Sequence, residues 1–167
     1  MNSNWIPIPN IDKECFGCGT ENSFGLKMTF VTNGKELRST LTVPEHTRGW
    51  NNLIHGGILT TILDEVMSWT AIHLTHNFIL TRDINVKFKK PVYVGTPITA
   101  TGTIKELNGK KALLEGHIDD ADGNLCCSSQ ANFVLFSPTE FSRLNIVPQD
   151  FLEKMNSTYN STKSDWV

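Results

Sequence analysis

The sequence predicts an α+β fold in which one long helix is covered by an antiparallel sheet. Three observations support this prediction: an early hairpin signal, one strongly periodic helical segment, and a later series of alternating segments joined by short turns. Consecutive strands that are joined by tight turns pair antiparallel. A parallel α/β arrangement is therefore not expected.

The first two strands are expected near residues 25–32 and 36–43. Both segments alternate between apolar and polar residues, and Asn33-Gly34 lies between them. An Asn-Gly pair adopts the positive φ angles that a two-residue hairpin turn needs. This pair therefore predicts a hairpin, which follows an N-terminal arm interrupted by prolines.

The long helix is expected to begin directly after Gly57. At 3.6 residues per turn, one wide apolar stripe is formed by Ile58, Leu59, Ile62, Leu63, Val66, Met67 and Trp69. The opposite face holds Thr60, Thr61, Asp64, Glu65 and Ser68. His73 falls on the apolar stripe, so we expect it in the core or in an interface.

After the helix the apolar period returns to two, which predicts a strand from Thr81 through Phe88. Further strands are expected near 97–106, 111–119 and 124–136, joined at Asn-Gly and Asp-Gly turns. The length of 167 residues fits one domain. We expect that domain, with its N-terminal arm, in residues 1–140, and a short helix with a polar, frayed tail in residues 141–167.

The composition excludes several classes of partner. Charged residues make up 19% of the chain and the net charge is -2, so no basic footprint for nucleic acid is present. No long apolar run and no export signal are visible, so neither a membrane nor secretion is expected. The sequence indicates a cytoplasmic protein with reduced cysteines.

The stretch NNLIHGGILTTILDE places His55, Gly56 and Gly57 where the helix begins. Unpaired backbone N–H groups and the positive end of the helix dipole make such a position suitable for an oxyanion. The alternative is that the glycines only allow a tight turn into a buried helix.

Asp64 follows Gly57 by seven residues, which places it on nearly the same face but about 10 Å further along the axis. One carbonyl group cannot contact both residues. If both act on one bond, they belong to two copies of the helix, and the site is shared across a dimer. The alternative for Asp64, and more so for Glu65, is a solvated outer face.

Two segments carry a family resemblance. HGGILTTILDE, followed by TRDINVKFKKPV, resembles the hotdog-fold acyl-CoA thioesterases of the phenylacetate-pathway (PaaI-like) type within the thioesterase superfamily. CFGCGTENSFGLKMTF resembles the opening of one branch of that group, so the similarity covers about residues 14–136. The resemblance implies a helix wrapped by a curved sheet, in a homodimer or a homotetramer formed as a dimer of dimers.

The resemblance also implies roles for individual residues. The Gly57 N–H would bind the thioester carbonyl, and Asp64 would act as general base or nucleophile. His55 would hold the helix start and contact the thioester region, while Thr81 would help to place the water. One position departs from the pattern: Gly49 stands where many members have Asn.

A wider group of residues is expected to contact the substrate. Asn51 or Asn52 could replace the missing Asn, and the lysines near the strand end could meet the phosphates of coenzyme A. The alternative for the lysines is an exposed edge that discourages aggregation. The expected contacts are Asn51, Asn52, Gly56, Glu65, Ser68, Lys87, Lys89 and Lys90.

No metal and no cofactor are expected. Cys15 and Cys18 have the spacing of half a zinc site, but Cys126 and Cys127 are adjacent and do not supply the other half. Cys15 and Cys18 are therefore expected to be packed loop cysteines, with a zinc site as the alternative.

The function expected from these observations is hydrolysis of an acyl-CoA thioester to a free acid and coenzyme A. A thioester of acyl carrier protein is a close variant. Two further alternatives are a hotdog domain that binds acyl-CoA without cleaving it, as a sensor or scaffold, and a dehydratase or hydratase on the same fold. No pattern in the sequence identifies the acyl group.

Overall fold

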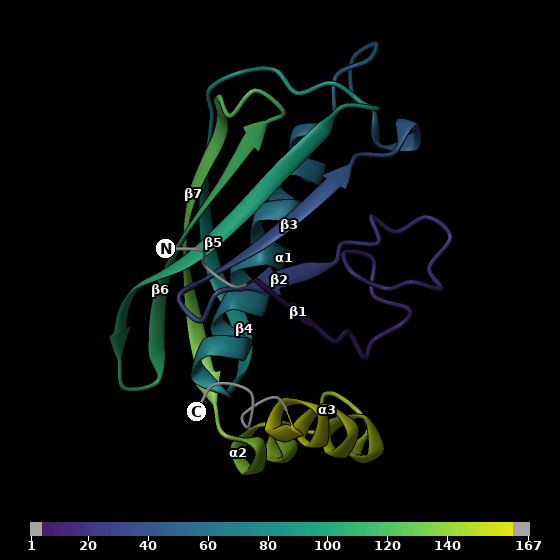
Figure 1. The fold of residues 1–167 in the computed structure, drawn as a ribbon. Helices are drawn as coiled ribbons and strands as arrows, with labels where there is room; N and C mark the ends of the chain where they lie inside the picture. The colour runs from purple at the N-terminus through teal and green to yellow at the C-terminus, as the bar shows by residue number, and fades with distance from the viewer. Residues whose placement is uncertain (1–4, 162–167) are drawn as a thin grey trace.

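A curved antiparallel sheet of seven strands wraps around one long helix, α1, in the computed structural model, which describes residues 5–161 (Figure 1). The strand order is β1-β2-β3-β5-β6-β7-β4, so β4 forms one edge. The strands are β1 (Ile6–Ile8), β2 (Phe30–Thr32), β3 (Glu36–Thr42), β4 (Phe78–Phe88), β5 (Pro97–Asn108), β6 (Lys111–Asp120) and β7 (Leu125–Phe136). The helices are η1 (Glu45–Thr47), α1 (Gly56–Thr75), α2 (Pro138–Leu144) and α3 (Gln149–Ser161).

This architecture confirms the expected α+β hotdog fold. The helix begins two residues earlier than predicted, at Gly56, and the late strands β5, β6 and β7 lie where their patterns predict them. The first predicted strand is shorter, because residues 25–29 are not extended into the sheet. There the N–H groups of Leu26 and Met28 donate to Phe16 and Gly17 of the N-terminal arm instead.

The apolar stripe of α1 packs directly onto the concave face of the sheet. Ile62, Leu63, Val66 and Met67 are fully buried, and His73 is also buried, as the helical period predicts. Gly102 of β5 permits the close approach, because a Cβ there would lie 2.4 Å from Thr70 Oγ1 and 3.0 Å from the Val66 carbonyl oxygen.

The chain end forms a second layer beside α1. Phe141 of α2 stacks on Phe78 with 4.8 Å between ring centroids, and Tyr159 of α3 meets the edge of Trp69 at 6.0 Å. Helix α2 was not predicted, and it crosses residue 140, the predicted end of the domain. The predicted frayed tail falls largely on residues 162–167, outside the described part.

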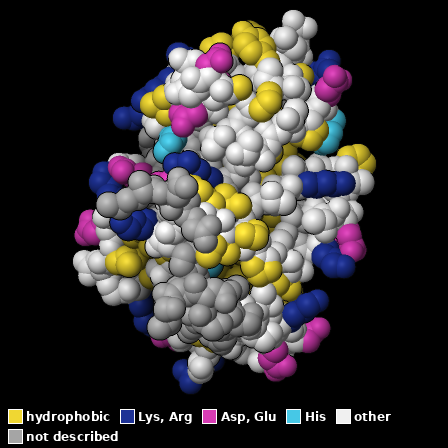
Figure 2. Space-filling model, viewed as in Figure 1, with side chains coloured by type: hydrophobic (Ala, Val, Ile, Leu, Met, Phe, Trp, Pro, Cys, Tyr) yellow, Lys and Arg dark blue, Asp and Glu magenta, His cyan; other side chains and the backbone are white. Residues whose placement is uncertain are grey.

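Charged side chains of both signs are spread over the surface (Figure 2). On the face shown in Figure 2, Lys and Arg side chains are scattered around the rim among Asp and Glu. None of the helices within residues 5–161 is long and apolar enough to cross a membrane.

Candidate active site

The start of α1 is capped by His55. Its backbone is extended, with φ -61° and ψ 134°, and its Nδ1 accepts a hydrogen bond of 2.9 Å from the Gly57 N–H. Because Nδ1 accepts, the neutral ring carries its hydrogen on Nε2. The Gly57 N–H, expected to face the substrate carbonyl, is therefore directed at the His55 ring.

Gly56, the first residue of α1, offers a different donor. Within residues 5–161 its N–H has no hydrogen-bond partner, while its carbonyl oxygen accepts from Thr60 Oγ1 at 2.9 Å. The Phe88 ring lies close by, since a Cβ on Gly56 would be 3.4 Å from Phe88 Cζ. The sequence pattern placed Phe88 on a strand but did not reveal that it contacts the helix start.

A cavity of about 340 Å³ opens at this helix start. Gly56 and Phe88 line it together with Lys89 and Lys90, which follow the end of β4. Two of the three expected lysines thus lie beside the glycine motif. A pocket lined by a glycine with an unpaired N–H and by two lysines suits an anionic ligand.

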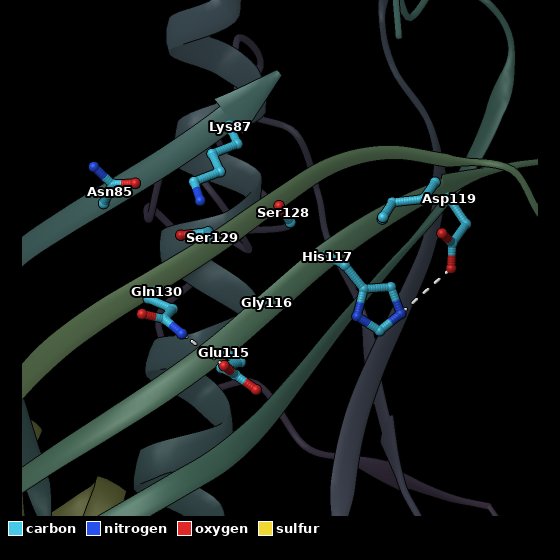
Figure 3. Close-up of a pocket in the computed structure, with 10 residues that line it drawn as sticks. Asn85, Lys87, Glu115, Gly116, His117, Asp119, Ser128, Ser129 and Gln130 are labelled. Atoms are coloured by element: carbon cyan, nitrogen blue, oxygen red, sulfur yellow. Dashed lines mark hydrogen bonds and ion pairs between the residues drawn. The ribbon is translucent and has the colours of Figure 1, made fainter. Parts of the chain in front are cut away.

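Lys87 lies elsewhere. It lines a cavity of about 600 Å³ on the outer face of the sheet, together with Glu115, His117 and Gln130 (Figure 3). The side chains of successive strand residues point to opposite faces of the sheet, so those of Lys87 and Phe88 lie on different faces. The structure therefore does not group Lys87 with the helix start.

Asp64 and Thr81 meet within one chain. The Thr81 hydroxyl donates a hydrogen bond of 2.9 Å to Asp64 Oδ1. The register of β4 against β7 shifts between Thr81 and Asp83, and such a bulge redirects nearby side chains. Burial raises the pKa of Asp64 above its ordinary value, and the hydrogen bond from Thr81 opposes that shift.

Glu65 lies in a different environment from Asp64. It accepts hydrogen bonds from Trp69 Nε1 at 3.2 Å and from Cys15 Sγ at 3.6 Å, beneath the N-terminal arm. Burial raises its pKa to about 7. Glu65 and Ser68 line a cavity of about 260 Å³ that also borders Trp69. The alternative considered for Glu65, a solvated outer face, does not hold, because the arm covers this residue; its predicted contact with the substrate stays a prediction.

The two asparagines lie in the exposed turn before the motif. Asn51 has a positive φ of 51°, and the Asn52 carbonyl accepts from the Val94 N–H. Within the described chain, neither side chain forms a hydrogen bond. Gly49 lies closer to the motif, since a Cβ there would be 3.2 Å from His55 Cα.

Comparisons with known proteins indicate the family that the chain resembles. The family model described as "Thioesterase superfamily" matches residues 51–127. The acyl-coenzyme A thioesterase THEM4 of Bos taurus is 23% identical over 132 residues, which are 77% of this chain and 54% of that protein. The chain thus spans about half the length of this curated relative.

Solved structures share the fold. A thioesterase superfamily protein is 26% identical, with a TM-score of 0.67, over 73% of this chain and 60% of that one. The E. coli PaaI protein from the phenylacetic acid degradation operon is 16% identical, with a TM-score of 0.61, over 67% of this chain and 81% of that one. The predicted resemblance to the thioesterase superfamily is confirmed, and the PaaI protein shares the fold.

Proposed function

We propose that the protein is an acyl-CoA thioesterase in which Asp64 activates the attacking water. The observation that supports this best is the hydrogen bond from Thr81 to a partly buried Asp64, in a chain similar to a curated acyl-coenzyme A thioesterase. Thr81 uses one oxygen of the carboxylate and leaves the other available for water. A carboxylate with a raised pKa removes a proton better than an ordinary one.

The reaction conserves its protons. Water attacks the thioester carbon while Asp64 takes its proton, and the carbonyl oxygen becomes an oxyanion. When the tetrahedral intermediate collapses, the carbon–sulfur bond breaks and the leaving thiolate recovers the proton from Asp64. A direct attack by the Asp64 carboxylate, with a covalent anhydride intermediate, is the alternative route.

The oxyanion donor that we propose is the Gly56 N–H rather than the Gly57 N–H. The His55 ring already occupies the latter, whereas the former has no partner within residues 5–161. His55 then has two tasks: its Nδ1 fixes the helix start, and its Nε2–H is available to the substrate. Lys89 and Lys90 would meet the phosphates of coenzyme A.

The site is proposed to form between two copies of the chain. Gly56 precedes Asp64 by eight residues, so about 12 Å of helix separates them along the axis. A single carbonyl group cannot reach both. Strand β4, which carries Thr81, is an edge strand of 11 residues with many exposed side chains, so a second copy can approach it.

Two substitutions at Gly56 test whether its N–H is the oxyanion donor. Gly56→Pro removes the N–H, but proline is favoured at the first position of a helix, and the extended His55 suits a residue before proline. Gly56→Ala keeps the N–H and adds the same Cβ. We expect Gly56→Pro to slow thiol release from acyl-CoA about 100- to 1000-fold, and Gly56→Ala much less. Equal losses in both variants would reject Gly56 as the donor.

Mixing tests the shared site. Co-expression of Gly56→Pro with Asp64→Asn makes half of the dimers hybrid, and each hybrid has one intact site if the site is shared. We expect about a quarter of the wild-type activity to return. If the mixture stays inactive although hybrids are detected by mass, the site lies within one chain. If the wild type releases no thiol from any acyl-CoA yet binds it, the protein is the non-catalytic binding domain.

A further inference from the structure

The N-terminal arm brings two thiols to a carboxylate of α1. The Sγ atoms of Cys15 and Cys18 and one carboxylate oxygen of Glu65 lie within 4.8 Å of one another. The cysteines are 50 and 47 residues away from Glu65 in the sequence, so the contact depends entirely on the fold. This cluster is separate from Asp64 and takes no part in the proposed hydrolysis.

The loop that carries the thiols is held firmly in place. The Gly19 N–H donates to the Cys15 carbonyl at 2.8 Å, and Asn10 Nδ2 donates to the Cys18 carbonyl. Gly17 lies directly on the carboxyl group, since a Cβ there would be 2.5 Å from Glu65 Cδ. The turn formed by residues 15–18 therefore packs directly against Glu65. Both sulfur atoms and the carboxylate oxygen are close enough to bind the same ion.

The cluster gathers three groups that can bind a metal ion in a partly buried place: Cys18 is buried, while Cys15 and Glu65 are half-buried. Within residues 5–161, neither a lysine nor an arginine forms an ion pair with Glu65. Thiols and a carboxyl group bind a metal ion in their deprotonated forms, and the charge of the ion offsets the cost of burying those anions.

Ligand chemistry selects the cation. Thiolates prefer soft or borderline metals, and zinc combines two cysteines with one nitrogen or oxygen ligand in tetrahedral sites. A fourth position is available, because the cavity of about 260 Å³ borders Cys15, Cys18 and Glu65. Calcium and magnesium are disfavoured, since they require mostly oxygen ligands.

We propose that Cys15, Cys18 and Glu65 bind a zinc ion that fastens the N-terminal arm to α1, with the fourth position open to water from the adjacent cavity. On binding, any protons still on the two thiols pass to solvent. The proposal does not depend on the thioesterase activity, because it concerns the side of α1 away from the Asp64–Thr81 pair.

Metal content gives the first test. Full-length protein, expressed in zinc-supplemented medium and purified without chelator, should contain about one zinc per chain. Cys15→Ser, Cys18→Ser and Glu65→Gln should each lose most of it. Cys126→Ser is the matched control, because Cys126 is buried in β7 and its replacement can keep the bond to the Asn124 carbonyl. Zinc-free wild type, or equal zinc in all variants, would overturn the proposal.

Cobalt gives a second test that does not depend on the variants folding. Wild-type protein, stripped of metal and reduced, should take up one Co²⁺ and show thiolate-to-cobalt charge-transfer absorption, which added zinc should abolish. Cobalt uptake should also protect Cys15 and Cys18 from alkylation. Absence of this absorption would overturn the proposal, as would a Cys15–Cys18 disulfide in the purified protein whose reduction yields no metal uptake.

Discussion

Asp64 and Glu65 are neighbours on one helix, yet they lie in different surroundings. Consecutive helix residues point about 100° apart, which is enough to send them to different sides of α1. Asp64 faces the edge strand and accepts from Thr81, whereas Glu65 faces the arm and accepts from Trp69 and Cys15. Burial raises the pKa of both carboxyls. The two carboxyl groups therefore differ in the residues that contact them and not in the direction of their pKa shifts.

The largest effect on activity is expected from Asp64→Asn, which tests whether Asp64 and Glu65 have different roles. The amide keeps the shape but cannot take a proton from water, so thiol release from acyl-CoA should fall about 100- to 10,000-fold. Zinc content and the unfolding midpoint should stay near those of the wild type. Turnover within tenfold of the wild type would show that Asp64 is not the base.

The second test removes the partner of Asp64. Thr81→Ala deletes a hydrogen bond to a charged group, and kcat/KM should fall about 10- to 100-fold. Thr81→Ser keeps the hydroxyl and should recover most of the activity. If serine and alanine behave alike, the hydroxyl does not position the carboxylate.

The third test concerns the contact between Gly17 and Glu65. Gly17→Ala places a Cβ 2.5 Å from Glu65 Cδ, and such overpacking should lower the free energy of unfolding by about 1–3 kcal/mol in urea. Glu65→Ala removes the atoms that clash. The double variant should therefore lose little more stability than Glu65→Ala alone, and purely additive losses would contradict the contact.

The smallest effect on stability is expected at the start of α2, the helix whose Phe141 lines the cavity beside Glu65. The Ser137 hydroxyl accepts from the Glu140 N–H, and Ser137→Ala should cost about 1 kcal/mol of unfolding free energy. Ser137→Thr preserves the cap and is the control. Thiol release should not change in either variant, because this helix start lies away from Asp64.

Local patterns predicted much of the fold. The apolar residues of helix α1 and of strands β5 to β7 recur with a clear period. Asn-Gly and Asp-Gly pairs mark the turns between these strands. Strand β1 was missed because it has three residues and pairs only with the short β2. Helix α2 could have been found, since Ser137 and Glu140 form a capping box visible in the sequence.

The site was predicted less completely. The family resemblance assigned Asp64 and Thr81 to one site, and the structure joins them by a hydrogen bond that was not predicted. The ring of His55 decides which glycine keeps an unpaired N–H, and a side-chain orientation cannot be read from spacing. The contact between Glu65 and Cys15 joins residues 50 positions apart, and no local period reports such a pairing.

The close approach of α1 to the sheet has a consequence for substrate choice. At Gly102 even one added carbon would strike the helix, and at Gly116 it would lie 3.1 Å from Met67. At these two positions the space between helix and sheet is therefore too narrow to admit a hydrocarbon chain. If the protein hydrolyses acyl-CoA as proposed, the acyl group would run along the outside of α1, and the residues that cover that side would limit its length. Variation among surface residues there, and not in the core, would adapt the protein to longer or shorter acids.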